Sequence, residues 1–229
     1  MSGDDTKYDS MWQSYLDRTH REVIQTLEET LRDTKDIKLL DISAGSGKIY
    51  EKLSESDLDF SRIVFNDPDA DAMSEERKEN IQSMFDCEVS FDDYYVKNLG
   101  YTNRSFDVVL SVSAYHLYEL KYNFFEEADR VLTHQGHLLI LDWYNKGWFA
   151  PIHWFISRWV EEEINSESPS EIIQRANKRW FSTQHSSTWS WRWWRFFTVV
   201  LQKYDDDFLG SSTASQEKAL GDTDNRKNT

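Results

Sequence analysis

Hydrophobic residues near the start of the chain recur at spacings of three and four positions. Between Tyr8 and Leu31, the positions that share this spacing are Trp12, Tyr15, Leu16, Val23, Leu27 and Leu31. Such spacing places apolar side chains on one face of an amphipathic helix. The pattern therefore predicts one helix over this segment, or two helices that are broken near Thr19 and His20.

Short apolar runs of strand length alternate with helical segments in the following part of the chain. The expected strands cover residues 37–42, 62–67, 87–91, 106–112 and 137–142. The expected helices between them cover residues 48–53, 70–85 and 124–132. We expect the fifth strand to follow a turn at Gln135 and Gly136. Alternating strands and helices are typical of a parallel sheet with helices on both faces.

The regular alternation ends after the fifth strand. Residues 143–160 are rich in aromatic side chains, residues 169–178 predict a polar helix, and residues 180–204 predict a final pair of strands. Later residues are polar with hardly an aromatic ring, which is typical of disorder. We therefore divide the chain into an N-terminal helical cap (1–36), an α/β domain (37–204) with an aromatic-rich insertion (143–178), and a disordered acidic tail (205–229).

Aromatic residues supply an unusual share of the apolar surface. The chain of 229 residues is only 39% hydrophobic, yet 15% of its residues are Phe, Trp or Tyr. Large rings contribute much of the buried area wherever they occur. We therefore expect some of them to line a pocket or an interface.

The net charge of −15 constrains the partners of the protein. An acidic surface repels phosphate backbones and anionic headgroups, so we expect no nucleic-acid partner. No apolar run is long enough to span a bilayer, which predicts no integral membrane association and a cytoplasmic location. The single cysteine, Cys87, excludes an internal disulfide and a cysteine-based zinc cluster, and we expect no metal site.

A loop with two glycines follows the first expected strand. In a doubly wound sheet, ligands bind outside the carboxyl ends of the strands, where the strand order reverses. Gly45 and Gly47 lie in this loop, before a helix N-terminus with free N–H groups. Asp67 ends the second strand, 20 residues after Gly47 (67 − 47 = 20), where an acid accepts hydrogen bonds from ribose hydroxyls. Each piece alone is ordinary turn or cap chemistry, but together they predict a ribose-bearing cofactor.

Five ordered motifs resemble those of the class I S-adenosylmethionine-dependent methyltransferases, in particular the small-molecule, type 11-like members. The stretches that carry the resemblance are 41–47 (DISAGSG), 64–69 (VFNDPD), 92–93 (DD), 106–117 (FDVVLS followed by HL) and 130–138 (RVLTHQGHL). The resemblance covers roughly residues 39–143 well and the flanks only in outline. The loop lacks the later glycine of dinucleotide dehydrogenases, which disfavours that class.

The resemblance implies a Rossmann-like α/β fold, a doubly wound sheet of seven mostly parallel strands with an antiparallel last strand and helices on both faces. It also implies S-adenosyl-L-methionine as the cofactor. The residues expected to bind it are Asp41, Ser43, Ala44, Gly45, Ser46, Gly47, Asn66, Asp67, Pro68, Asp92, Asp93, Ser111 and Tyr8. Asp41 is expected near the cofactor's amino group, Asp67 at the ribose, and Asp92 and Asp93 at the adenine amine.

Two positions depart from the family pattern. Ser43 stands where the family has the first glycine of the loop, and His134-Gln135 stands where it has Pro-Gly. A serine is compatible with the loop if its φ stays negative, and its hydroxyl is then available to the cofactor. The same substitution is compatible with a weakened or lost cofactor site, but the retained Asp41 argues against a loss.

Methyl transfer from a sulfonium consists mainly of holding an acceptor in line with the methyl group. A base is needed only where the acceptor must lose a proton. His116, which follows the fourth strand, is the candidate for that role. The alternative is that His116 packs beside the sheet or contacts the cofactor. Asp142 ends the fifth strand at the same edge and is the second catalytic candidate, or else an anchor for a loop or for the acceptor.

We expect two aromatic segments to converge on the mouth of the active site. They are residues 143–155 and the turn of the last two strands near residues 189–195. Such walls suit an aromatic or apolar acceptor, with Lys146, Arg192 or Arg195 available for an anionic group. These aromatic segments have other possible roles. They are consistent with a buried hairpin face and a packed helix, with a dimer interface, or with a surface that rests on a membrane to reach a lipid or quinone acceptor.

The sequence thus predicts a methyltransferase of a small, aromatic or apolar molecule, and it allows a homodimer. One alternative is a cofactor-binding homologue without activity that acts as a partner or regulatory subunit, because Ser43 departs from the pattern and no strong catalytic constellation is evident. A methyltransferase of proteins or nucleic acids is a further alternative, which the negative charge disfavours.

Overall fold

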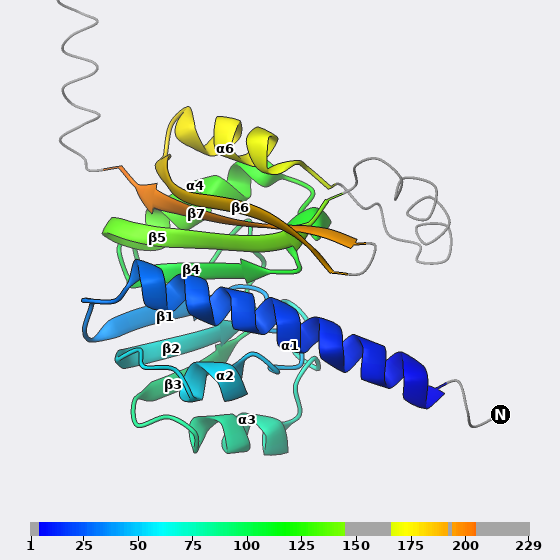
Figure 1. Ribbon diagram of the computed structural model, residues 1–229. Coiled ribbons are helices and arrows are strands. Elements are labelled where there is room, and N and C mark those ends of the chain that lie inside the picture. Colours follow the sequence, from blue (N-terminus) through cyan, green and yellow to red (C-terminus); the bar gives the residue numbers. More distant parts are fainter. Residues whose placement is uncertain (1–4, 145–165, 192–193, 205–229) are drawn as a thin grey trace, which may run out of the picture.

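The structure is a computed structural model that describes residues 5–144, 166–191 and 194–204, with side chains described from Gln13 onward in the first helix. Seven strands form one sheet in the order β3-β2-β1-β4-β5-β7-β6 (Figure 1). The strands are β1 (Ile37–Asp41), β2 (Phe60–Asn66), β3 (Glu88–Asp92), β4 (Phe106–Val112), β5 (Leu132–Trp143), β6 (Phe181–Trp191) and β7 (Trp194–Lys203). Strands β1 to β5 are parallel and β7 is antiparallel to both of its neighbours, so the predicted fold class is confirmed.

Helices cover both faces of the sheet (Figure 1). They are α1 (Asp5–Thr30), α2 (Tyr50–Ser54), α3 (Glu75–Gln82), the 3₁₀ turn η1 (Tyr115–Leu117), α4 (Lys121–Val131) and α6 (Pro169–Asn177). Apolar side chains of α1, α2 and α3 pack on one face, and those of α4 and α6 pack on the other. Within the described residues, no helix is both long and apolar enough to cross a membrane.

Helix α1 is continuous through Thr19 and His20, so a single helix replaces the alternative of two. The buried Thr19 hydroxyl donates to the backbone carbonyls of Tyr15 and Leu16, both at 3.1 Å. His20 is also buried, and burial lowers its pKa to about 4, so the ring packs in its neutral form. Local hydrogen bonding and a neutral ring let two polar residues stay inside one helix.

Helix α3 is shorter than the expected segment 70–85. It begins after Ser74, whose side-chain oxygen accepts a hydrogen bond from the backbone N–H of Arg77. A serine in this position caps a helix by pairing an N–H group that the first turn leaves free. The cap fixes the start of α3 and leaves residues 70–73 in the connection that follows β2.

Strand β5 begins at Leu132, earlier than the expected residue 137. The predicted turn lies inside the strand, where Gln135 has a φ of 59° and the pairing with β4 shifts register. An added Cβ at Gly136 would lie 3.0 Å from the Thr133 carbonyl oxygen and 3.2 Å from that of Asp107. The backbone therefore leaves the regular strand conformation at Gln135 and then continues in the same strand.

The carboxyl ends of the parallel strands lie at one edge of the sheet, on the right in Figure 1. Strand β6 is antiparallel to β7 and so runs in the same direction as β5, which brings the end of β6 to that edge. The N-terminal end of α1 extends past the same edge (Figure 1). The predicted turn near residues 189–195 is confirmed in place, although residues 192 and 193 lie outside the described residues.

Candidate functional site

The loop between β1 and α2 needs both of its glycines. Gly45 has a φ of 49° and Gly47 a φ of 72°, a backbone region that side chains with a Cβ rarely adopt. At Gly47 a Cβ would also lie 2.1 Å from Cε2 of Tyr50. At Gly45 the nearest atom to an added Cβ is the Ser43 carbonyl oxygen at 4.0 Å, so the backbone angle alone requires glycine there.

Ser43 has a structural task that the sequence did not suggest. Its backbone N–H and its hydroxyl both donate to Oδ1 of Asp41, each at 2.9 Å. The same hydroxyl oxygen accepts the backbone N–H of Val112 at 2.8 Å. Ser43 has no positive φ, as expected. Its hydroxyl thus ties the end of β1 to the end of β4, and its contact with a cofactor stays a prediction.

Asp41 is buried beneath the glycine loop and is 1% exposed. Burial is the largest cause that raises its pKa, to about 6, while the two hydrogen bonds from Ser43 oppose the rise and nearby Asp67 adds to it. A buried acid with a raised pKa is a costly residue that commonly marks a functional site. Its position fits the expectation that a ligand's amino group binds here.

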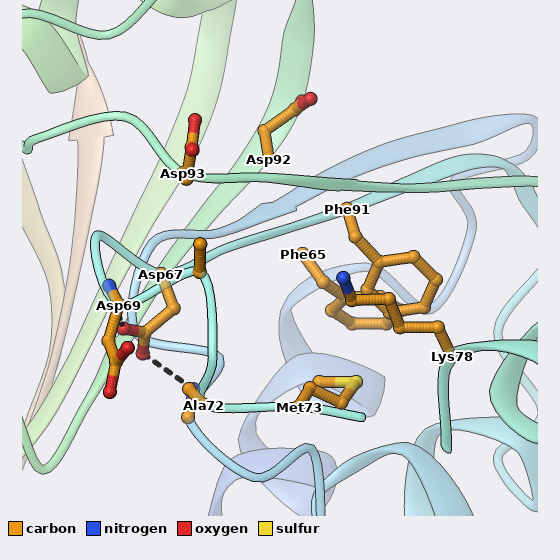
Figure 2. Close-up of a pocket in the computed structure, with 11 residues that line it drawn as sticks. Phe65, Asp67, Asp69, Ala72, Met73, Lys78, Phe91, Asp92 and Asp93 are labelled. Carbon is orange, nitrogen blue, oxygen red and sulfur yellow. Dashed lines mark hydrogen bonds between the residues drawn. The ribbon is translucent and has the colours of Figure 1, made fainter. Parts of the chain in front are cut away.

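Asp67 follows β2 and turns toward the glycine loop. Its Oδ2 accepts the backbone N–H of Gly45 at 2.7 Å, drawn as a dashed line in Figure 2, and its Oδ1 accepts the backbone N–H of Asp69 at 3.0 Å. The carboxylate therefore joins the loop after β1 to the loop after β2. Since each carboxylate oxygen has two lone pairs, both oxygens can still accept from a ligand.

A cavity of about 210 Å³ opens beside this contact. Figure 2 shows Phe65, Phe91, Met73 and Lys78 on one side of it and the carboxylates of Asp67 and Asp69 on the other. The complete lining consists of Gly45, Phe65, Asp67, Asp69, Ala70, Ala72, Met73, Lys78, Phe91, Asp92 and Asp93. Four of the predicted cofactor residues, Gly45, Asp67, Asp92 and Asp93, thus line one cavity at the carboxyl edge.

Other predicted cofactor residues lie outside the cavity lining. Asn66 is buried and ties down the loop after β3, since its side chain donates to the Tyr94 carbonyl at 2.9 Å and accepts from the Tyr94 N–H at 2.8 Å. The hydroxyl of buried Ser111 lies 3.0 Å from that of Tyr118. Ala44 is buried, whereas Ser46 and Pro68 are exposed. Their roles toward a cofactor remain predictions, and so does that of Tyr8, whose side chain lies outside the described residues.

Tyr50 packs against Gly47 of the glycine loop and was not singled out by the sequence reasoning. Its side chain is fully buried, and its hydroxyl has no hydrogen-bond partner among the described residues. Burial raises the pKa of this hydroxyl well above its usual range, and the charges of Asp41 and Asp67 raise it further. An unpaired buried hydroxyl costs free energy that a ligand's polar group recovers. Nothing in the sequence pattern distinguished this tyrosine from a core residue.

His116 and Asp142, the two predicted catalytic residues, form a hydrogen-bonded pair. The His116 Nδ1 lies 2.9 Å from Oδ1 and 3.0 Å from Oδ2 of Asp142. The backbone N–H of His116 donates to Oδ2 at 2.8 Å, and that of Trp143 donates to Oδ1 at 2.7 Å. Asp142 is 1% exposed and the His116 side chain 12%. The sequence named both residues, but their direct contact comes from the packing of η1 against β5.

Aromatic side chains from α1 and the β6–β7 hairpin meet near this pair. The Tyr15 ring lies 6.1 Å from Trp191, 6.5 Å from Trp194 and 5.6 Å from Phe196, measured between centroids. The Tyr15 hydroxyl lies 2.8 Å from that of Ser113, and burial is the main cause that raises its pKa to about 12, with a contribution from Asp142. These rings confirm the predicted aromatic hairpin at this edge, whereas most of the second segment, residues 145–155, lies outside the described residues.

Ser113 connects this aromatic cluster to the sheet. It has a φ of 56°, which is unusual for a serine, and its N–H donates to the Leu141 carbonyl at 2.8 Å. Backbone strain of this kind persists where the surrounding contacts fix the residue, and it often occurs at functional sites. No sequence pattern signals this strain, because it follows from packing against β5 and α1.

Residues 40–140 match a family model described as a methyltransferase domain. This range runs from β1 to the middle of β5 and includes the glycine loop, Asp67, Asp92 and His116. No curated protein sequence matches the chain.

Solved structures share the fold at low sequence identity. A structure described as an S-adenosylmethionine-dependent methyltransferase from Methanosarcina mazei is 15% identical with a TM-score of 0.60, over 75% of this chain and 94% of that one. The YcgJ protein from Bacillus subtilis is 14% identical with a TM-score of 0.61, over 82% and 99%. The 1,6-didemethyltoxoflavin-N1-methyltransferase of Burkholderia thailandensis, solved with 1,6-didemethyltoxoflavin and S-adenosylhomocysteine, is 14% identical with a TM-score of 0.65, over 87% of each chain.

Proposed function

We propose that the chain is a class I S-adenosylmethionine-dependent methyltransferase, as the methyltransferase-domain match over residues 40–140 supports, and that its methyl acceptor is a small aromatic or apolar molecule. The observation that carries the proposal is the aromatic cluster of Tyr15, Trp191, Trp194 and Phe196 at the edge that also holds the glycine loop. Flat apolar walls favour a ring or an alkyl group over a strongly hydrated substrate.

The residues around the cavity fit an adenosyl cofactor. Asp67, Asp92 and Asp93 offer carboxylate oxygens to ribose hydroxyls and to an adenine amino group. Phe65 and Phe91 offer apolar ring surfaces for a purine. The unpartnered Tyr50 hydroxyl, close to the charges of Asp41 and Asp67, adds a polar atom that is suited to a bound polar ligand.

When bound, S-adenosyl-L-methionine supplies a methyl group on a positively charged sulfur. The residues of the chain then have to hold the acceptor in line with that methyl group and exclude water. Asp41 and Asp67 place negative charge beside the glycine loop, which favours a cationic ligand. Tyr15 of α1 contacts Ser113 after β4 and Phe196 of β7, which limits the access of water to this edge.

Isothermal titration calorimetry with S-adenosylhomocysteine tests the cofactor site first, and we expect saturable binding to the purified full chain. Turnover is then measured as S-adenosylhomocysteine released from S-adenosylmethionine in the presence of two acceptor panels. One panel holds small aromatic compounds, and the other holds small hydrated amines such as glycine and sarcosine.

We expect turnover with the aromatic panel alone. Turnover with the amines alone contradicts the proposed acceptor class. Tight binding of S-adenosylhomocysteine without turnover of either panel favours instead the inactive partner subunit that the sequence allows.

A further inference from the structure

The pairing of His116 with Asp142 fixes which ring nitrogen carries the proton. Three N–H groups converge on the Asp142 carboxylate, namely the backbone groups of His116 and Trp143 and the Nδ1 position of the His116 ring. An ionised carboxylate accepts hydrogen bonds but cannot donate one. The neutral imidazole therefore keeps its proton on Nδ1, and its lone pair lies on Nε2.

The Nε2 side of His116 is available to a ligand. No hydrogen bond involves this nitrogen among the described residues, and the side chain keeps 12% of its surface exposed whereas Asp142 keeps 1%. The Trp143 ring centroid lies 4.9 Å from that of His116. The imidazole thus has an aromatic neighbour, and its Nε2 lies on the side of the ring away from the buried carboxylate.

The pair also lies beside the glycine loop. Val112, at the end of β4, donates its N–H to the Ser43 hydroxyl at 2.8 Å. Ser113 donates its N–H to Leu141, one residue before Asp142, at 2.8 Å. The segment that leads to His116 is therefore fixed to the glycine loop on one side and to β5 on the other.

We propose that His116 Nε2 is the general base of the transfer, that Asp142 positions it, and that the acceptor is an aromatic hydroxyl. This inference rests on the proposed function. A neutral amine already offers a lone pair and does not need a base before attack, whereas a phenolic oxygen becomes a strong nucleophile only as its proton leaves. A base held by a dedicated carboxylate beside aromatic rings thus fits a phenol better than an amine.

The step balances without a further reactant. The acceptor oxygen forms a bond to the methyl carbon while the methyl–sulfur bond breaks, and that electron pair stays on sulfur, which becomes neutral. The hydroxyl proton passes to His116 Nε2, and the Asp142 charge stabilises the imidazolium that forms. The imidazolium then releases the proton to water.

Other titratable groups surround the pair. The charge of Asp142 acts on Tyr15 of α1, on Tyr118 after η1 and on Lys121 of α4. Burial is the largest cause that lowers the pKa of Lys121, to about 8, and its ammonium donates to the Tyr115 carbonyl. Within the part of the chain that the structure describes, none of these groups is hydrogen-bonded to Nε2, so the test varies the acidity of the acceptor as well as the pH.

The experiment compares two phenols of different acidity. 4-Methylphenol resembles a tyrosine side chain, which ionises at about pH 10. At about pH 8 this phenol is therefore protonated and needs a base. 4-Nitrophenol is largely ionised at about pH 8 and needs none. We expect His116→Gln to lower kcat/KM for 4-methylphenol by about 10²–10⁴-fold, a typical contribution of a general base, but for 4-nitrophenol by less than about tenfold.

Asp142→Asn tests the positioning role. The amide presents N–H to the ring in place of an oxygen and so favours the wrong tautomer. We expect the same discrimination between the two phenols, together with a pH profile of kcat/KM for 4-methylphenol that differs from that of wild type. The exposed His185→Gln and Asp86→Asn are the matched controls, and neither changes either rate.

The outcomes separate this inference from the proposed function. Equal losses for both phenols in His116→Gln would mean a purely structural pair and would overturn the inference. A wild-type protein that binds S-adenosylhomocysteine and methylates aromatic amines but neither phenol overturns it as well, while the proposed function survives. Failure to bind S-adenosylhomocysteine overturns the proposed function itself.

Discussion

Asp67 joins two loops and faces the cavity, so it is the residue on which cofactor affinity should depend most. Asp67→Ala removes the acceptor of the Gly45 N–H and an acceptor for ligand hydroxyls. We expect S-adenosylhomocysteine binding to weaken by about 1–3 kcal/mol, measured by calorimetry. Asp71→Ala, an exposed aspartate in the same connection, is the control and keeps wild-type affinity. Unchanged affinity in Asp67→Ala would place the ribose site elsewhere.

The buried Asp41 makes the folded protein less stable as the pH rises from about 4 to about 6. Burial raises its pKa from 3.8 to about 6, so the folded state resists the charge that the unfolded chain carries. Folding is therefore penalised above about pH 6, and the penalty fades as the pH falls toward about 4. Asp41→Asn keeps an oxygen for the two Ser43 donors and removes the charge.

We expect the free energy of unfolding of Asp41→Asn to exceed that of wild type by about 1–3 kcal/mol at about pH 8 and to equal it at about pH 4. Denaturant unfolding at both pH values measures this difference. The same difference at both values would show that the charge of Asp41 is not its cause. We also expect the variant to bind S-adenosylhomocysteine more weakly, because stability and function compete at this position.

Helix α1 is the element that covers the site, and its attachment depends on Tyr15. The ring contacts three aromatic residues of the β6–β7 hairpin, and the hydroxyl contacts Ser113. Tyr15→Phe should lower the free energy of unfolding by about 1 kcal/mol, because it removes one hydrogen bond. Tyr15→Ala should lower it by about 3–5 kcal/mol, because it also leaves a cavity.

Hydrogen exchange distinguishes loosening of α1 from global destabilisation. We expect amides of α1 near Tyr15 to exchange faster in Tyr15→Ala, while those of α4 change less. Tyr95→Ala, at a tyrosine that is 63% exposed, is the control and should change stability by less than about 0.5 kcal/mol. Equal acceleration in α1 and α4 would mean that α1 is not a separately opening element.

At the scale of the whole molecule, the net charge of −15 opposes compaction through self-repulsion. Salt screens this repulsion, since the screening length falls to about 8 Å at physiological ionic strength. Raising sodium chloride from about 10 mM to about 150 mM should stabilise the fold by about 1 kcal/mol, which for a chain of this size raises Tm by about 2–4 °C. Thermal unfolding measures the shift, and a Tm that falls with salt would contradict a dominant role of repulsion.

The order of the elements followed from local patterns along the chain. Apolar runs, charged helical faces and the glycine loop are read within short windows, so the five parallel strands and the edge where the loops gather could be predicted. The positions of Gly45, Asp67 and His116 followed from the same local order. The start of β5 could not, because Gln135 takes a positive φ inside the strand and the first residue, Leu132, belongs to the strand through its pairing with Phe106 of β4.

By itself, the sequence determined the fold class, the glycine loop and the list of acids at the strand ends, because each depends on residues close together in the chain. Only the tertiary structure decided that Ser43 bonds to Asp41 and Val112, that Asp142 holds His116, and that Tyr15 reaches Ser113. Most of these contacts join residues that are distant in sequence. Their geometry depends on how helices and strands pack, which no local pattern encodes.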